Sequence, residues 1–124
     1  MHRLIAATLI ATSAALASGQ PQIALPNREG SVRFAVIGDS GTGGGAQREV
    51  AEQIAAAHAR FPFEFAIMLG DNLYGREREG DYESKFERPY KPLLDAGVKF
   101  YASLGNHDEP DQRFYKPFNM NGER

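Results

Sequence analysis

Short apolar runs alternate with a helical pattern along this chain. Residues 32–38, 65–69 and 98–102 are apolar and rich in β-forming side chains, whereas residues 46–60 carry apolar side chains at helical spacing. A strand, a crossover helix and a second strand form a unit in which the two strands run parallel. The sequence therefore predicts an α/β fold with parallel strands in the order βαβαβ, covered by helices.

A second, shorter helix is expected between the second and third apolar runs. Asp81 is suited to cap its N-terminus, and Tyr82 and Phe86 fall on one helical face. Pro89 is expected to end it, because proline lacks the amide proton that continues a helix. This helix supplies the second crossover of the predicted sheet.

Each predicted strand ends in glycine and polar side chains. The sequence reads Gly-Asp-Ser-Gly at 38–41, Gly-Asp-Asn-Leu-Tyr at 70–74 and Gly-Asn-His-Asp at 105–108. Parallel strands end at one edge of the sheet, where ligands bind in open α/β folds, so the three clusters are expected to meet. Glycine beside each strand end permits a sharp turn and the close approach of a ligand. Carboxylates, an amide, a phenol and an imidazole are therefore predicted to converge.

Two of these side chains indicate a metal site. Asp39 and Asp71 would repel each other at this edge unless a cation lay between them. A carboxylate with both oxygens free can bridge two ions about 3.5 to 4 Å apart, as two-metal sites do. Asp71 follows the middle cluster's strand and is the candidate bridge.

The three clusters resemble the GDxG, GDxxY and GNH(D/E) motifs of purple acid phosphatases, within the calcineurin-like metallophosphoesterases. The resemblance covers residues 32–118 and implies that Asp39 binds the first metal and that Asp71 bridges both. Tyr74 would bind the first metal as a phenolate, and Asn106 would bind the second. The fold it implies is the N-terminal half of the αββα sandwich of that family.

The resemblance gives the third cluster a role toward the substrate. His107 would contact the phosphate or protonate the leaving group, and Asp108 would orient that imidazole. The implied activity is a metal-dependent phosphoester hydrolase, an acid phosphatase acting on phosphate monoesters, in which two ions clamp the phosphoryl oxygens while water attacks in line. Small-molecule phosphoesters and phosphoproteins are the expected substrates.

The resemblance also indicates which metals to expect. Most metallophosphoesterases have histidine two residues after the first aspartate, whereas this chain has Gly41 there and supplies Tyr74 instead, which is the purple acid phosphatase variation. A phenolate ligand favours Fe(III), and the other oxygen donors suit divalent Fe, Zn or Mn. Two metal ions, Fe(III) with one of these divalent ions, are the expected cofactors.

The N-terminus has the layout of a cleaved signal peptide. A basic start precedes an uncharged run rich in Ala, Leu and Ile, which closes on a small-x-small pattern at 15–17 and is shorter than the roughly 20 residues that span a bilayer. We expect a signal peptide at 1–17, a linker at 18–30 and a metallophosphoesterase domain at 31–124. The protein is then secreted or periplasmic, without a stable membrane anchor after cleavage.

Charge and cysteine content exclude several kinds of partner and site. The formal net charge is -2, which gives no broad basic surface, so no nucleic-acid partner is expected. The sequence contains no cysteine, which excludes disulfides and thiolate metal sites. Any metal must therefore be held by oxygen or imidazole donors.

The family pattern requires later histidines, in VxxH-like and GHxH blocks, that this sequence does not supply. Its histidines are His2 in the predicted signal peptide, His58 near a helix end, where it is expected to be half-buried, and His107. Asn-Gly at 121–122 is a two-residue hairpin signal, and the sequence ends before a partner strand. We therefore expect a truncated, N-terminal part of the domain that is inactive by itself.

Two other functions fit parts of the sequence. Gly41, Gly43 and Ala46 match the G-x-G-x-x-G/A fingerprint of dinucleotide-binding folds. Against it, Asp39 would repel a pyrophosphate, and the aspartate expected about 20 residues further on is missing. An exported phosphate-binding module would instead hold an anion at the amides of the glycine-rich stretch 41–45. That function leaves the other two clusters without a role.

Overall fold

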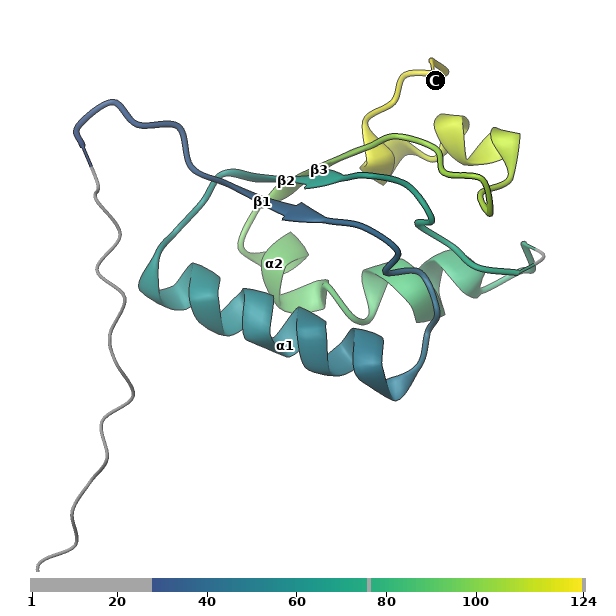
Figure 1. Cartoon of the computed structure of the whole chain (residues 1–124), viewed down its shortest axis with the longest axis horizontal. Helices are drawn as coiled ribbons and strands as arrows, with labels where there is room; N and C mark the ends of the chain where they lie inside the picture. Colours follow the sequence, from purple (N-terminus) through teal and green to yellow (C-terminus); the bar gives the residue numbers. More distant parts are fainter. Residues whose placement is uncertain (1–27, 76, 124) are drawn as a thin grey trace, which may run out of the picture.

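The computed structural model describes residues 28–75 and 77–123 (Figure 1). Three strands, β1 (Phe34–Ile37), β2 (Phe65–Met68) and β3 (Lys99–Ala102), form one parallel sheet in the order β1-β2-β3. Each strand lies inside the apolar run that predicted it. The predicted α/β class with parallel strands is therefore confirmed.

The register of the sheet aligns the carboxyl ends of its strands. Ile37 pairs with Met68, and Met68 pairs with Ala102. The loops that follow the three strands therefore leave the sheet at the same edge. This arrangement is the one that the sequence predicts for the three polar clusters.

Helices cover one face of the sheet. The long helix α1 (Gly45–Arg60) joins β1 to β2, the short helix α2 (Lys91–Asp95) precedes β3, and both lie on the same side of the sheet in Figure 1. Helix α1 begins at the glycines after β1 and buries Gln47 and Ala51. The helix predicted over residues 46–60 is confirmed.

The segment between β2 and β3 differs from the predicted single helix. It forms a π-helical turn, η1 (Glu83–Glu87), in which the Arg88 N–H donates to the Glu83 carbonyl at 2.8 Å, and α2 follows it. The prediction that Asp81 caps a helix is wrong. Its carboxylate instead accepts a hydrogen bond from the Lys85 ammonium at 2.9 Å.

Aromatic side chains form the centre of the core. Phe86, Tyr90, Phe100 and Phe118 are each at most 1% exposed. The Phe86 ring stands edge-on to Phe100 and to Phe118, with ring centroids 5.0 and 4.9 Å apart. Burial of one such side chain contributes about 1.5–3 kcal/mol, and edge-to-face contact adds to it. The cluster fixes the segment after β3 against η1.

After β3 the chain forms two short 3-10 helices, η2 (Pro110–Phe114) and η3 (Lys116–Phe118), and then a turn. Asn121 and Gly122 have φ angles of 54° and 84°, and the turn is closed by a hydrogen bond from the Glu123 N–H to the Met120 carbonyl at 3.0 Å. Positive φ at both central residues is typical of a type I′ turn. The turn predicted from Asn-Gly is therefore confirmed.

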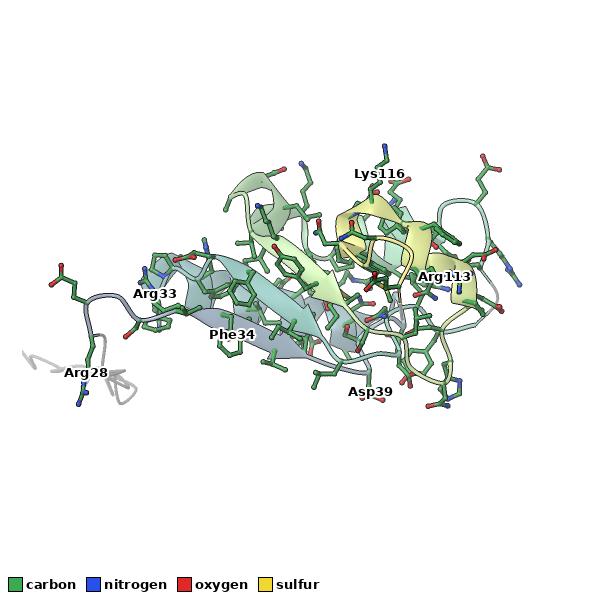
Figure 2. All side chains as sticks on the ribbon, turned by 90° about the horizontal axis from the view of Figure 1, so that it is seen from above. Arg28, Arg33, Phe34, Asp39, Arg113 and Lys116 are labelled. Atoms are coloured by element: carbon green, nitrogen blue, oxygen red, sulfur yellow. The ribbon has the colours of Figure 1, made fainter. Side chains whose placement is uncertain are left out.

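The other face of the sheet carries exposed apolar side chains. Phe34, Val36 and Tyr101 are 48%, 51% and 43% exposed. They alternate along their strands with side chains that face the helices, because successive strand residues point to opposite faces. Figure 2 is seen from the side away from α1 and α2, with Phe34 labelled. The described residues leave this face open to solvent.

Residues 1–27 lie outside the described residues, and with them the predicted signal peptide and most of the predicted linker. The division of the chain at residues 17 and 30 stays a prediction. Within residues 28–75 and 77–123, no helix is long and apolar enough to cross a membrane.

Candidate functional site

The loops after β1 and β2 are joined by backbone hydrogen bonds at the carboxyl edge of the sheet. The Asp39 N–H donates to the Gly70 carbonyl at 3.1 Å. Gly41 donates its N–H to the Asp71 carbonyl at 3.1 Å and accepts the Tyr74 N–H at 2.9 Å. The first two polar clusters therefore lie in direct contact, and Figure 2 shows Asp39 beyond the end of β1.

Glycines allow these loops to lie closer together than any side chain would permit. A Cβ at Gly41 would lie 2.0 Å from the Asn72 carbonyl oxygen, and one at Gly105 would lie 2.2 Å from Asp71 Oδ1. Real Cβ atoms essentially never show contacts below 3.0 Å. The glycines thus admit the neighbouring loop, whereas the sequence predicts that they admit a ligand.

Both aspartates of the predicted site adopt a left-handed backbone. Asp39 has a φ of 52° and Asp71 a φ of 51°. Residues other than glycine adopt such sparsely populated conformations at a cost of roughly 1–3 kcal/mol, although aspartate tolerates this region better than most. The same backbone conformation therefore recurs after two neighbouring strands.

The Tyr74 hydroxyl joins the two carboxylates. Its oxygen lies 3.0 Å from Oδ1 of Asp39 and 2.9 Å from Oδ2 of Asp71. A phenol carries a single proton to donate, so the Tyr74 hydroxyl can donate to only one of the two carboxylates at a time. Oxygen donors with excess negative charge suit hard cations. The cluster of Asp39, Asp71 and Tyr74 therefore fits a metal ion.

The electrostatics of the cluster follow from these contacts. The hydrogen bond to Asp71 is the largest cause that raises the pKa of Tyr74, and burial and Asp39 add to it. Burial acts to raise the pKa of Asp71, but the His107 amide and the Tyr74 hydroxyl, helped by His107 and Asp39, hold that pKa below its ordinary value. At neutral pH Asp71 is therefore ionised, and the Tyr74 hydroxyl keeps its proton.

His107 in the third loop lies beside this cluster. Its backbone N–H donates to Oδ1 of Asp71 at 3.1 Å, and its ring stands beside the Tyr74 ring with 5.1 Å between centroids. Asn106 precedes it in the turn after β3, and both residues are exposed. The structure thus brings His107 to the cluster and places Asn106 at the surface next to it. Their roles toward substrate and metal stay predictions.

Asp108 ties the third loop to the second. Its carboxylate accepts hydrogen bonds from the backbone amides of Leu73 and Gly105, at 2.9 and 2.8 Å. It also accepts one from the Asn72 side-chain amide at 3.0 Å. Within the described residues, these contacts join the carboxylate to the two loops rather than to the His107 imidazole, and orientation of His107 by Asp108 stays a prediction.

The donor set of the cluster differs from the commonest metal sites. Within residues 28–75 and 77–123, no group of three or more His, Cys, Asp or Glu side chains is arranged to hold a metal ion. The cluster has two carboxylates, and its third donor is the Tyr74 phenol. An ion bound here would therefore have a tyrosine among its ligands.

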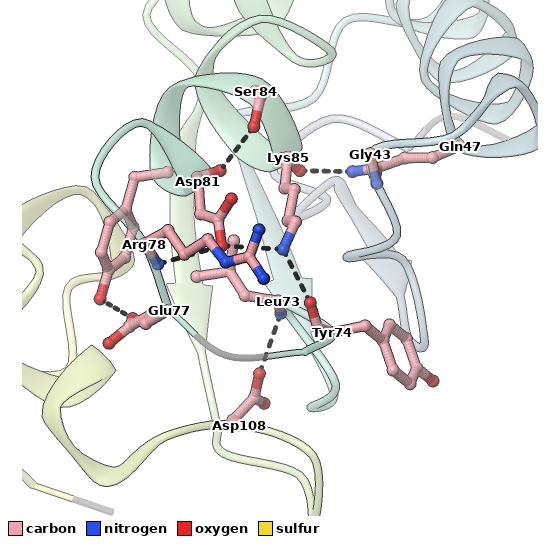
Figure 3. Close-up of polar contacts among 11 residues, drawn as sticks. Gly43, Gln47, Leu73, Tyr74, Glu77, Arg78, Asp81, Ser84, Lys85 and Asp108 are labelled. Carbon is pink, nitrogen blue, oxygen red and sulfur yellow. Dashed lines mark hydrogen bonds and ion pairs between the residues drawn. The ribbon is translucent and has the colours of Figure 1, made fainter.

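Sequence reasoning missed three side chains that support the site. Asn72 is 1% exposed, and its amide donates to the Ser103 carbonyl at 2.7 Å as well as to Asp108. Gln47 and Lys85 connect the first two loops from the helical side (Figure 3). Asn72 could have been found from its place inside the second polar cluster, whereas the other two lie outside all three clusters.

In the glycine-rich stretch 41–45, the amides of Gly41, Gly43 and Gly44 are hydrogen-bonded within the protein. The Gly43 N–H donates to Oε1 of Gln47 at 2.6 Å, and the Gly44 N–H donates to the Thr42 hydroxyl at 3.2 Å. Amides engaged in this way are not available to hold a phosphate or a pyrophosphate. The geometry therefore opposes both the dinucleotide-binding function and the phosphate-binding module.

Comparisons with known proteins agree with the motifs. A family model described as calcineurin-like phosphoesterase matches residues 32–124. Purple acid phosphatase 7 of Arabidopsis thaliana is 33% identical over 84 residues, which cover 64% of this chain and 26% of that protein. Purple acid phosphatase 4 of the same plant is 31% identical over 87 residues, which cover 67% of this chain and 26% of that protein. The match thus spans about a quarter of the length of these relatives. No solved structure matches significantly.

Proposed function

Because the chain belongs to the calcineurin-like phosphoesterase family, we propose that the protein is a metal-dependent acid phosphatase that hydrolyses phosphate monoesters. The observation that carries this proposal is the Tyr74 hydroxyl in contact with the carboxylates of Asp39 and Asp71. The likeness to two purple acid phosphatases supports this kind of hydrolase, and the parallel sheet agrees with the N-terminal half of the family fold. Small-molecule phosphoesters and phosphoproteins are the proposed substrates.

The proposed cofactor is a pair of metal ions. Asp39 and Tyr74 would hold the first ion, Asp71 would bridge, and Asn106 would hold the second. Fe(III) together with divalent Fe, Zn or Mn fits this set, because a phenolate favours trivalent iron and the other donors are oxygens. Such a pair would act as a Lewis acid toward the phosphoryl oxygens and would activate the attacking water.

His107 is the proposed group that acts on the substrate, and Asp71 and Asp108 would hold its loop in place. The exposed His107 imidazole, beside the Tyr74 ring, would contact the phosphate and protonate the leaving oxygen. The backbone N–H of His107 donates a hydrogen bond to the Asp71 carboxylate, and Asp108 joins the loop of His107 to the Leu73 amide. These two contacts would hold His107 in position. Asp108 would thus contribute to catalysis by placing the third loop against the second.

Export of the protein is proposed from residues 1–17 alone. Their basic start, apolar run and small-residue exit are typical of a signal peptide. The mature protein would then act outside the cytoplasm, as a secreted or periplasmic hydrolase.

The substitution Asp71→Asn in the full-length protein tests the proposed function. An amide offers one neutral oxygen where a bridge needs two anionic ones, so we expect kcat to fall by about 100-fold or more and one metal equivalent to be lost. Turnover of a chromogenic phosphate monoester with added iron, zinc or manganese, and metal content by elemental analysis, are measured together. The 124-residue chain is assayed beside it and is expected to be inactive, because its four proposed ligands leave each ion with few protein donors.

Asp95→Asn is the matched control for this experiment. Asp95 lies on α2, and its side chain is 63% exposed in an ion pair with Lys91. The control should keep wild-type turnover and metal content. Near wild-type turnover with both metals in Asp71→Asn would show that Asp71 is a turn residue and would reject the proposal.

A further inference from the structure

Lys85 contacts the Tyr74 loop from the helical side of the site. Its ammonium donates to the Tyr74 backbone carbonyl at 2.7 Å and to Oδ2 of Asp81 at 2.9 Å (Figure 3). The Arg78 N–H donates to the same Asp81 oxygen at 3.1 Å. Hydrogen bonds from a charged donor are shorter and stronger than neutral ones. Tyr74, whose hydroxyl joins the two carboxylates, is thus held at its backbone carbonyl by the Lys85 ammonium.

The pair of Lys85 and Asp81 is shielded from solvent. Each of its side chains is 16% exposed, whereas those of Lys91 and Asp95 in the pair on α2 are 68% and 63% exposed. Partly buried ion pairs are screened less by salt and water than exposed ones. Lys85 is therefore held in place, and Lys91 offers a control with the same residue types at the same spacing.

The backbone of Lys85 holds the glycine-rich loop through Gln47. Gln47 is 5% exposed, its Nε2 donates to the Lys85 carbonyl, and its Oε1 accepts the Gly43 N–H at 2.6 Å. Gly43 also packs on the Lys85 stem, because a Cβ at Gly43 would lie 3.1 Å from Lys85 Cγ. Lys85 consequently reaches the loop after β1 through its backbone and the loop after β2 through its side chain.

We propose that Lys85 is a positioning residue that fixes the Tyr74 hydroxyl between the two carboxylates. The proposal rests on the proposed function, in which Tyr74 binds metal. Tyr74 is anchored by three sets of hydrogen bonds: its N–H donates to the Gly41 carbonyl, its carbonyl accepts from the Lys85 ammonium, and its hydroxyl contacts the carboxylates of Asp39 and Asp71. Of these contacts, only those with Gly41 and Lys85 hold the backbone of Tyr74. Without the Lys85 contact, one of the two remains, and the hydroxyl can shift relative to the carboxylates.

Lys85→Met in the full-length protein tests this proposal, because methionine removes the ammonium and keeps most of the stem. The protein is loaded with Fe(III) and Zn(II). We measure the visible band of phenolate-to-Fe(III) charge transfer, and kcat and KM on a chromogenic phosphate monoester. We expect a shifted or weakened band, with kcat about 10-fold lower and KM within about twofold of wild type. Lys91→Met should match wild type, and Lys85→Arg, which keeps a cationic donor, should restore much of the band.

A folded Lys85→Met variant with the wild-type band and kcat overturns the proposal, even if its thermal midpoint is lower. If Lys85→Met yields no folded protein, Asp81→Asn removes the carboxylate that orients the ammonium. An unchanged band and kcat in Asp81→Asn then overturn the proposal, and altered values support it. A wild-type protein without the band or without phosphoesterase activity refutes the proposed function instead, so the two failures are distinguishable.

Discussion

Gly105→Ala tests whether the contact between the second and third loops governs the site. The added Cβ would lie 2.2 Å from Oδ1 of Asp71 and 2.4 Å from its backbone nitrogen, and the first contact must lengthen to at least 3.0 Å. Forcing extra volume into a packed contact costs about 1–3 kcal/mol. Since the displaced group is a proposed metal ligand, a shift approaching 1 Å is expected to lower kcat by about 100-fold.

The assay compares Gly105→Ala with Gly45→Ala in the full-length protein. A Cβ at Gly45, the first residue of α1, would meet nothing within 4 Å, and alanine favours a helix over glycine by up to about 1 kcal/mol. Thermal unfolding should show a midpoint lower by about 2 °C or more for Gly105→Ala and an equal or higher one for Gly45→Ala. If Gly105→Ala keeps both the wild-type midpoint and a kcat within about twofold of wild type, the loops yield without consequence and the reasoning is refuted.

Two further predictions concern acid stability and export. Lys85 is the largest cause that holds the pKa of Asp81 below its ordinary value, so the stabilisation from this pair is present above the unfolded-state pKa, about 4, and is lost as pH falls through the lower folded-state pKa. In urea unfolding, the free energy of unfolding of wild type should therefore exceed that of Lys85→Met by an amount that is constant from about pH 7 to 5 and shrinks below about pH 4. An excess that grows toward acid pH would contradict this. For residues 1–17, N-terminal sequencing of protein from a secreting host should find a mature chain that begins near Ser18, and a retained Met1 would argue against export.

The regular elements were predictable where their patterns are strong, and the errors have physical causes. The strands and α1 follow from apolar periodicity, but α2 was missed because Pro89 is expected to end the helical segment. Pro92 lies in the first turn of α2, where the missing amide proton would have no partner in any case. Asp81 does not cap the helix because it lies inside the helical segment, where its carboxylate accepts hydrogen bonds from the Arg78 amide and the Lys85 ammonium.

The candidate site was predictable as far as topology determines it. Asp39 and Asp71 follow neighbouring parallel strands, and that alone places them at one edge of the sheet. The supporting contacts depend on how distant segments pack, as in the hydrogen bond between Gln47 and Lys85, which are 38 residues apart in sequence. Which amides the Asp108 carboxylate accepts is likewise decided by the folded loops and not by local spacing.

Asp39 is a proposed metal ligand with a left-handed backbone, so stability and the proposed function favour different residues at this position. This residue is exposed, and its carboxylate accepts a hydrogen bond from the Tyr74 hydroxyl. Glycine adopts the same backbone at lower cost, and glycine or asparagine would remove the negative charge beside Asp71. A gene copy released from its function is therefore expected to lose aspartate at this position early. Retention of aspartate at position 39 in related sequences would indicate that the proposed pair of Asp39 and Asp71 is still under selection.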